Sequence, residues 1–187
     1  MKSSVLCCKI IAMSGHSKWS TIKHKKAATD AKRGVVFAKL AKMIYLAVKQ
    51  GGSGDVSKNP FLRGALDEAR SANMPSDNVR RAIDKALGVG GGQAMIEIEY
   101  EGYGPGGVGI IITSVTDNKN RTGGEIRTCF DKFGGSLGEP GSVSYMRKID
   151  PIPLIELKGE DFQRAVDLLK ALDDHEDIVM IWSNLKQ

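Results

Sequence analysis

The sequence predicts an α+β protein in which an N-terminal domain of three to four helices is followed by a domain of sheet and helices. Three observations support this fold class. Apolar residues recur with a helical period of 3.6 up to about residue 88, and after a glycine-rich linker at 89–93 the period changes to 2. Residues 14–50 hold nine lysines and arginines against one acid, Asp30, whereas residues 51–187 carry a net negative charge. This asymmetry indicates a polyanionic partner for the basic N-terminal part.

The first predicted helix covers residues 34–50, which have an apolar side and a basic side. The apolar side consists of Phe37, Leu40, Ile44 and Val48, and the basic side of Lys39, Lys42 and Lys49. Because the lysines lie opposite the apolar residues, we expect them to face solvent.

Two further helices complete the helical domain, which is expected over residues 34–88. Asn59 and Pro60 have the residue types of an N-cap and a first helical position. The next helix is expected to start with Ser76 or Asp77 as its cap and to end near Gly88.

The second domain, expected over residues 94–187, begins with two predicted strands. Residues 95–103 alternate apolar residues with glutamates, which is typical of a half-buried strand. Residues 107–117 hold an unbroken apolar run, which suits a central strand. Between them, residues 102–107 match G-x-G-x-x-G, but that phosphate-binding pattern needs a helix after the loop. Because a strand follows and Pro105 has no amide proton, we expect a structural hairpin loop.

The remaining elements are a helix, a short strand and a final strand–helix–strand unit. The helix covers residues 120–133, with Gly134 past its end. The short strand covers residues 141–148, and the final unit covers residues 152–184. The apolar faces of the two helices consist of Ile126, Phe130 and Phe133, and of Phe162, Val166, Leu169 and Leu172. We expect both helices on one face of the sheet.

The sequence contains no catalytic or metal-binding pattern. His16, His24 and His175 lack partners at the spacing of zinc ligands. Cys129 fits a buried structural thiol better than a nucleophile. A cluster of carboxylates between the last helix and strand could bind a cation weakly, but a solvated acidic turn is favoured. Its members are Asp173, Asp174, Glu176 and Asp177. We therefore expect no enzymatic activity, no cofactor and no metal.

The bulk properties favour a cytoplasmic protein with no membrane association. The cysteines, Cys7, Cys8 and Cys129, provide no disulfide framework and suit a reducing compartment. No apolar run reaches the ~18 residues that span a bilayer. Residues 1–13 are interpreted as an N-terminal extension, with Met13 as an alternative start to Met1. A monomer is favoured, although the sequence leaves the oligomeric state open.

Residues 14–33 form a basic arm with little to bury. Its only large aliphatic residue is Ile22, so the arm alone should be frayed or disordered. Trp19 lies among the lysines, where its ring could stack on a base. We predict phosphate or base contacts, which the first helix would extend, from Lys18, Trp19, Lys23, Lys25, Lys26, Lys32, Arg33, Lys39, Lys42 and Lys49. The alternative is a solvated tail.

A second candidate phosphate site lies at the start of the 120–133 helix. It consists of Lys119, Asn120 and Arg121, next to helix N-terminal amides that could bind an anion. Ordinary capping by Asn118, Asn120 or Thr122 accounts for these residues equally well.

Six stretches of the chain carry specific motifs. They are "GHSKWSTIKHKKAATDAKRG", "NPFLRGAL", "ANMPSDNVRRAI", "YEGYGPGGVGIIITSVTDNKNRT", "FGGSLGEPGSVSYM" and "DDHEDIVMIWSN". Together they resemble the YebC/PmpR family, which includes the mitochondrial translational activator of cytochrome oxidase subunit one. The resemblance implies a helical domain, then α+β domains, and no catalysis. It maps the family's basic segment onto His16, Lys18, Trp19, Lys23, His24, Lys25, Lys26, Lys32 and Arg33.

One part of the family pattern is missing. After about residue 147 the relatives continue into an inserted α+β domain, whereas "RKIDPIPLIEL" passes almost directly to the final unit. We therefore expect two domains where the family has three. This shortening bears on any function that depends on the insert.

The favoured function is a non-enzymatic regulator of gene expression that binds RNA or the ribosome and activates translation. RNA is favoured because the helices show no helix-turn-helix reading face, and a flexible basic arm reads shape and charge more readily than base edges. Transcriptional regulation through duplex DNA is the close alternative. A third hypothesis is a protein–protein adaptor that docks a partner on the acidic α+β domain.

Overall fold

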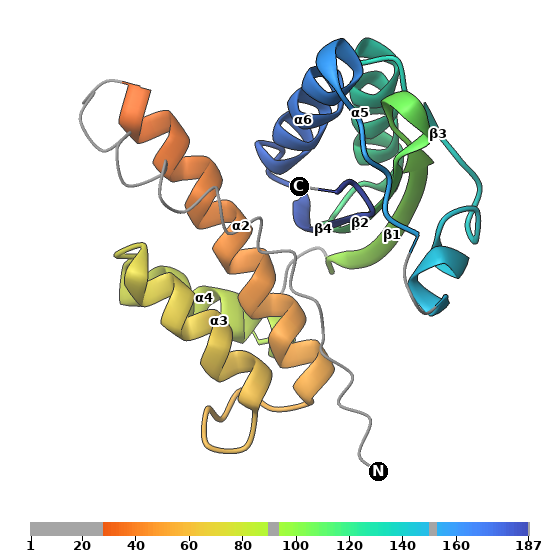
Figure 1. The fold of residues 1–187 in the computed structure, drawn as a ribbon. Coiled ribbons are helices and arrows are strands. Elements are labelled where there is room, and N and C mark those ends of the chain that lie inside the picture. Colours follow the sequence, from red (N-terminus) through yellow and green to blue (C-terminus); the bar gives the residue numbers. More distant parts are fainter. Residues whose placement is uncertain (1–27, 90–93, 150–152, 187) are drawn as a thin grey trace.

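The computed structural model describes residues 28–89, 94–149 and 153–186, with side chains from Arg33 onward. It confirms the α+β class: a unit of helices lies beside a four-stranded sheet that carries two more helices (Figure 1). Among the described helices, none combines the length and the apolar character that crossing a bilayer requires.

The helical unit consists of α2 (Ala28–Gly51), α3 (Pro60–Ser71) and α4 (Ser76–Leu87). The predicted start of the first helix was wrong by six residues, because α2 continues back from Gly34 into the end of the basic arm. The predicted cap of α3 is confirmed. The buried Asn59 side chain accepts a hydrogen bond from the Leu62 amide at 3.0 Å and donates to the Ala47 carbonyl at 2.9 Å. It therefore joins the start of α3 to α2.

The start of α4 differs from the prediction. Pro75, rather than Ser76 or Asp77, occupies the N-cap position and provides no side-chain hydrogen bond. Gly88 then ends the helix in the left-handed conformation, with φ +78°. The predicted end of this helix near Gly88 is therefore confirmed.

The sheet has the strand order β3-β1-β2-β4, and every neighbouring pair is antiparallel. Its strands are β1 (Ile96–Tyr103), β2 (Gly109–Thr116), β3 (Ser136–Leu137) and β4 (Ile178–Ser183). The 3₁₀ turn η1 (Pro105–Gly107) joins β1 to β2, which confirms the hairpin loop. The central position of the apolar strand β2 is confirmed as well.

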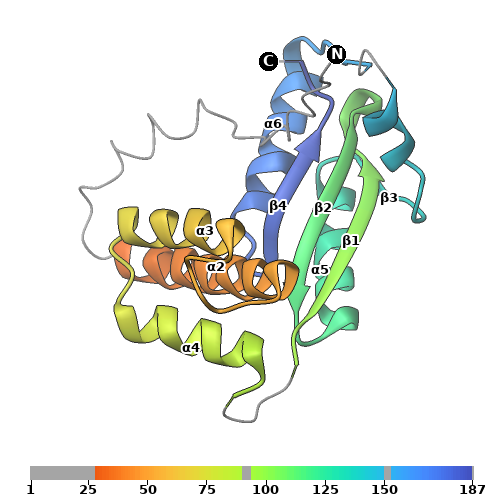
Figure 2. The same cartoon turned by 90° about the horizontal axis from the view of Figure 1, so that it is seen from below.

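Helices α5 (Lys119–Lys132) and α6 (Gly159–Asp173) both cover one face of the sheet (Figure 2). Their core contacts include Ile110 and Ile112 of β2. The apolar face of α5 is confirmed by buried Ile126 and Phe130. The predicted apolar face of α6 was wrong in part. Phe162 is exposed, and the buried residues of the helix are Ala165, Leu168 and Leu172.

Two predicted strands, at 141–148 and at the start of the 152–184 unit, are absent from the described residues. The segment 141–148 contains the 3₁₀ helix η2 (Ser144–Lys148), and 153–157 contributes only an isolated bridge between Ile155 and Leu185. The carboxylate of Glu101 gives the physical reason for the first difference. It accepts hydrogen bonds from the Gly141 and Ser144 amides, both at 2.8 Å, so these amides are not available for a sheet ladder.

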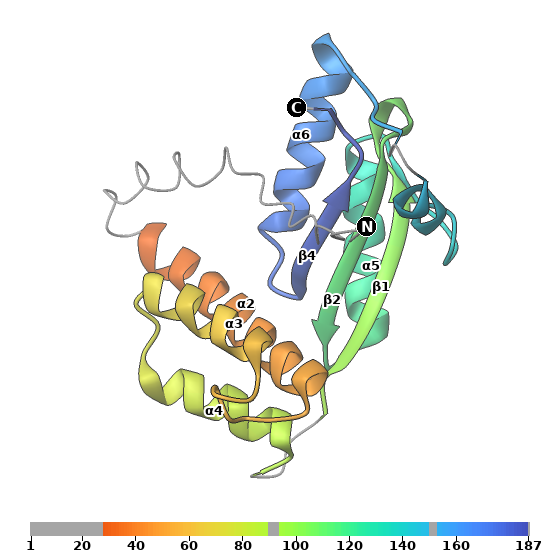
Figure 3. The same cartoon turned by 60° about the horizontal axis from the view of Figure 1, so that its bottom comes forward.

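The helical unit packs against one end of the sheet (Figures 2 and 3). One side of α2 contacts α3 and α4, and another side contacts β4. Val115 of β2 and Val179 of β4 belong to the same apolar cluster as the core of α2. The Tyr45 hydroxyl donates to the Met95 carbonyl at 3.0 Å. These contacts hold the helical unit against the sheet.

Candidate nucleic-acid interface

Most of the predicted arm lies outside the described residues. This holds for His16, Lys18, Trp19, Lys23, His24, Lys25 and Lys26, and for the side chain of Lys32. The backbone of residues 28–33 forms the first turns of α2, and Arg33 is exposed there. The arm thus leads directly into the helix that holds the helical unit together.

The prediction that Lys39, Lys42 and Lys49 share a solvent-facing side was wrong. Lys42 is only 9% exposed and donates to the Asp177 carboxylate and, at 3.0 Å, to the Glu176 carbonyl. Lys39 donates to the Asp173 carboxylate at 2.9 Å. The cause is the second packing face of α2: its basic side covers the α6–β4 turn instead of facing solvent.

Lys49 keeps the predicted exposure. Its ammonium lies 5.7 Å from the centroid of the Tyr45 ring, at the end of α2 away from the arm. Among the lysines of α2 with described side chains, Lys49 is therefore the one that remains available for a phosphate.

Asp177 is the centre of the interface between the two units. Its side chain accepts hydrogen bonds from Lys42 of α2 and, at 2.7 Å and 3.1 Å, from Thr122 and Arg121 of α5. Burial alone would raise the pKa of Asp177, but these donors outweigh burial and hold the pKa well below its ordinary value. The interpretation of residues 173–177 as a solvated turn was therefore wrong for Asp177, which is 1% exposed.

The start of α5 has the geometry of ordinary capping. The Asn118 side chain accepts from the amides of Asn120 and Arg121, both at 3.1 Å. The Arg121 guanidinium donates to Asp117 and Asp177, also at 3.1 Å each. Because its charge is matched by two carboxylates, Arg121 is a weak candidate for phosphate binding, whereas Lys119 and Asn120 remain exposed.

The fold brings together Glu125, His175 and Asp177, whose potential ligand atoms lie within 4.8 Å of one another. The Asp177 amide donates to Nδ1 of His175 at 3.1 Å, so the ring proton is assigned to Nε2, which lies 2.9 Å from Glu125. Both ring nitrogens are thus used within the chain. The arrangement fits an internal hydrogen-bond network better than a metal centre.

Cys129 lies half-buried against the core beneath α5. Burial raises the pKa of its thiol, which disfavours the reactive thiolate. The geometry agrees with a structural side chain.

Sequence reasoning missed two exposed cations of α4, Arg81 and Lys85. They are four residues apart, so they lie on one helix face, and that spacing was a usable signal. It missed the pairing of Lys42 with Asp177 because contacts 135 residues apart leave no local pattern.

Two family models match the chain. The TACO1/YebC protein N-terminal domain matches residues 17–89, and the TACO1/YebC second and third domain matches residues 95–148.

Similar proteins in bacteria share the name probable transcriptional regulatory protein. One from Enterococcus faecalis is 54% identical over 80% of this chain and 60% of its own length. One from Roseiflexus castenholzii is 46% identical over 94% of this chain and 72% of its own length. One from Brachyspira hyodysenteriae is 49% identical, and the chain covers 64% of its length. The chain therefore spans about three fifths to three quarters of these relatives.

The fold also matches a solved structure. A conserved hypothetical protein from Aquifex aeolicus superposes with a TM-score of 0.74 and 30% sequence identity, covering 90% of this chain and 96% of the other. The fold, both family models and the relatives agree, and the chain belongs to the TACO1/YebC family.

Proposed function

We propose that this chain is a non-enzymatic regulator of gene expression that binds nucleic acid through its basic arm. The observation that carries the proposal is the concentration of nine cations against one acid in residues 14–50, on a chain whose remainder is acidic. Lys39 and Lys42 are matched by Asp173 and Asp177, which leaves the arm and Lys49 to contact phosphates. The names of the relatives support a role in regulation.

RNA, including ribosomal RNA, is the favoured ligand. The α2 helix is packed on two sides, so it is not free to enter a major groove as a recognition helix. On α3 and α4, Arg70 and Arg80 are near carboxylates of the same helix, at 3.0 Å and 3.8 Å. Such surfaces favour sequence-independent contacts with phosphates, and a basic arm with little to bury suits RNA shape.

The arm is tested by replacing Lys23, Lys25, Lys26 and Lys32 with Ala. Binding to single-stranded RNA and to duplex DNA is measured by fluorescence anisotropy, with circular dichroism to confirm folding. We expect at least a tenfold loss of affinity. The matched control replaces four exposed, ion-paired cations elsewhere, namely Lys58, Arg70, Arg164 and Lys186. Equal affinity in the arm variant and the wild type would overturn the proposal.

Translation is separated from transcription by sedimenting a cell lysate on a sucrose gradient. The favoured function predicts that the chain travels with ribosomes at low salt and leaves them as the salt concentration rises. Recovery on chromosomal DNA alone would instead support the alternative that the relatives' names favour, a DNA-binding transcriptional regulator.

A further inference from the structure

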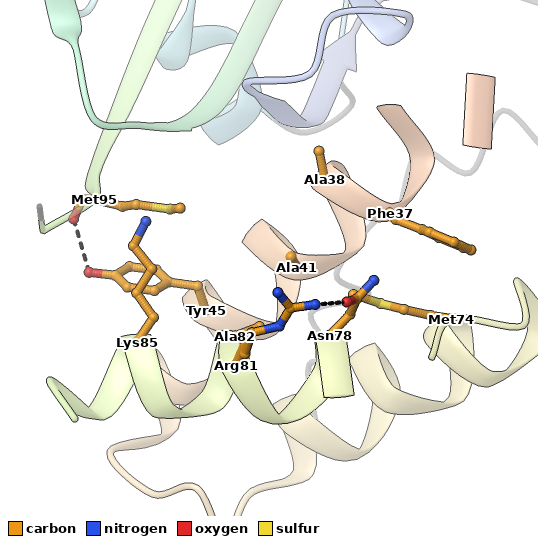
Figure 4. A pocket seen from close by; sticks show the side chains of 10 residues that line it. All are labelled: Phe37, Ala38, Ala41, Tyr45, Met74, Asn78, Arg81, Ala82, Lys85 and Met95. Atoms are coloured by element: carbon orange, nitrogen blue, oxygen red, sulfur yellow. Dashed lines mark hydrogen bonds between the residues drawn. The ribbon is translucent and has the colours of Figure 1, made fainter. Parts of the chain in front are cut away.

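A groove of about 310 Å³ lies between α2, α4 and the residue before β1 (Figure 4). Its floor consists of the small residues Ala38, Ala41 and Ala82, which leave space between the two helices. Phe37 and Tyr45 line it from α2, and the thioethers of Met74 and Met95 complete the apolar wall. This volume is at the lower end of the range for ligand pockets, so the groove has room for one small group.

Two cations on α4 give the groove a positive rim. Arg81 and Lys85 lie one helical turn apart on the side of α4 that faces α2 (Figure 4). Arg81 donates to the Asn78 side chain and, at 3.3 Å, to the Asp77 carbonyl, and both acceptors are neutral. Among the described side chains, which begin at Arg33, no carboxylate forms an ion pair with either cation. The nearby carboxylate of Asp84 is instead 3.8 Å from Arg80.

The wall that carries Tyr45 is held in place before any ligand arrives. The Tyr45 hydroxyl donates to the Met95 carbonyl at 3.0 Å, which fixes the ring at the end of the groove (Figure 4). The ammonium of Lys49 lies 5.7 Å from the same ring. A third cation is therefore close to the apolar wall.

An apolar slot with cations at its rim matches the two halves of a nucleotide, because the base is flat and weakly polar and the phosphate is anionic. The groove also starts at Phe37, one helical turn from Arg33, which is the last residue of the basic arm. A strand bound along the arm would therefore reach it. The arm itself is an unfavourable occupant, because its charge has the same sign as the rim.

From this geometry we propose that the α2–α4 groove binds a single unstacked base of RNA, with its phosphate on Arg81 and Lys85. The inference rests on the proposed function, since it assigns a base-binding site to the RNA that the arm holds. It predicts that the chain contacts bases as well as phosphates.

The test uses the full chain with ¹³C-methyl-labelled methionine and the mononucleotide adenosine 5′-monophosphate as probe. We expect the methyl signals of Met74 and Met95 to shift on titration, while those of Met146 and Met180, which lie away from the groove, stay in place. Ribose 5-phosphate, which lacks the base, should cause no such shift. The variant R81Q/K85Q should bind the nucleotide at least about fivefold more weakly.

Two further variants separate the groove from general charge and from folding. The variant R70Q/R80Q removes the same charge outside the groove and should bind like the wild type. The variant Ala38→Leu fills the floor without changing charge and should weaken nucleotide binding. Both are checked for folding by thermal unfolding.

If the methyl signals of Met74 and Met95 do not shift when the nucleotide is added, the proposed groove site is wrong. RNA affinity, measured by anisotropy, reports separately on the arm, so the proposed function stands if RNA still binds and falls if it does not. Three other results for the Met74 and Met95 signals would also overturn the site. The signals could change with protein concentration, they could shift when residues 1–27 are deleted, or they could shift with hexaglutamate but not with the nucleotide. Those outcomes assign the groove to a second copy, to the arm or to an acidic peptide.

Discussion

At the scale of single residues, Asp177 has the most consequences. It is buried, accepts from three side chains on two helices, and joins the helical unit to the sheet. Its replacement by Asn would leave Lys42 buried without a counter-charge, which costs on the order of 3 kcal/mol. Urea unfolding at pH 7 measures this loss. The variant Asp67→Asn is the control, because the exposed pair of Asp67 with Arg70 should contribute no more than about 1 kcal/mol.

The pH dependence follows from the same carboxylate. The pKa of Asp177 in the folded state is below its ordinary value, so the folded state gains stability from the ionised form above the unfolded pKa of about 3.9. This contribution is lost as the pH falls through and below that value. The free energy of unfolding should therefore fall more steeply below about pH 5 in the wild type than in D177N. Parallel curves for the two proteins would contradict the assignment.

Glu101 shows how one residue can change an element. Burial alone would raise its pKa, but the amides of Gly141, Val143 and Ser144 outweigh burial and hold the pKa below its ordinary value. The alternation of apolar residues with glutamates predicted a half-buried strand over residues 95–103. The fold instead buries Glu101 to 5% exposure, because the chain at 141–144 returns to cover it.

At the scale of elements, the helices were predictable where local signals fix them. Asn59 caps α3, and Gly134, with φ +79°, follows the C-cap of α5 as expected. Local sequence signals gave wrong predictions where contacts with residues distant in the sequence determine the structure. The segment 141–148 reads as a strand, but its amides bind Glu101. The face of α6 is set by the position of the sheet, which periodicity does not specify.

Replacing two glycines by alanine should have opposite effects on stability, because one glycine is closely packed in the sheet and the other lies in an open part of a helix. A Cβ at Gly102 of β1 would lie 2.6 Å from the Ser136 carbonyl oxygen and 2.8 Å from the Phe130 ring, so Gly102→Ala should destabilise the protein by about 1–3 kcal/mol. Gly124 lies inside α5, and apart from its chain neighbours and the backbone of its own helix no atom lies within 4 Å of its Cβ position, so Gly124→Ala should stabilise by roughly 0.5–1 kcal/mol. Thermal unfolding should move in opposite directions for the two variants. A shared direction would contradict the packing at β1.

At the scale of the whole molecule, some of the cations hold the two units together and others remain on the surface. The sequence identified α2 as a basic amphipathic helix, but it could not show that two of its lysines face the second unit. That information lies in the α6–β4 turn, more than 130 residues away. Arg81 and Lys85 line the groove because α4 packs on α2, and this packing could not be predicted from the sequence either.

Lys42 and Lys49 should therefore have different roles, although the sequence predicted phosphate contacts for both. Lys42→Gln should lower the free energy of unfolding by about 1–3 kcal/mol, because buried Asp177 would lose one of its two cationic partners and keep only Arg121. Lys49→Gln should leave stability within about 0.5 kcal/mol and weaken RNA binding only a few-fold. Urea unfolding and anisotropy measure the two effects. A stable K42Q variant with weak RNA binding would show that Lys42 faces the ligand instead.

The central claim, that the basic arm contacts nucleic-acid phosphates, is tested most directly by the salt dependence of RNA binding. The logarithm of the association constant is plotted against that of salt concentration for the wild type and for the variant with Lys23, Lys25, Lys26 and Lys32 replaced by Ala. Each phosphate contact on a single strand contributes a slope of about 0.7, so the variant's slope should be shallower by up to roughly 3. An unchanged slope and affinity would contradict the claim.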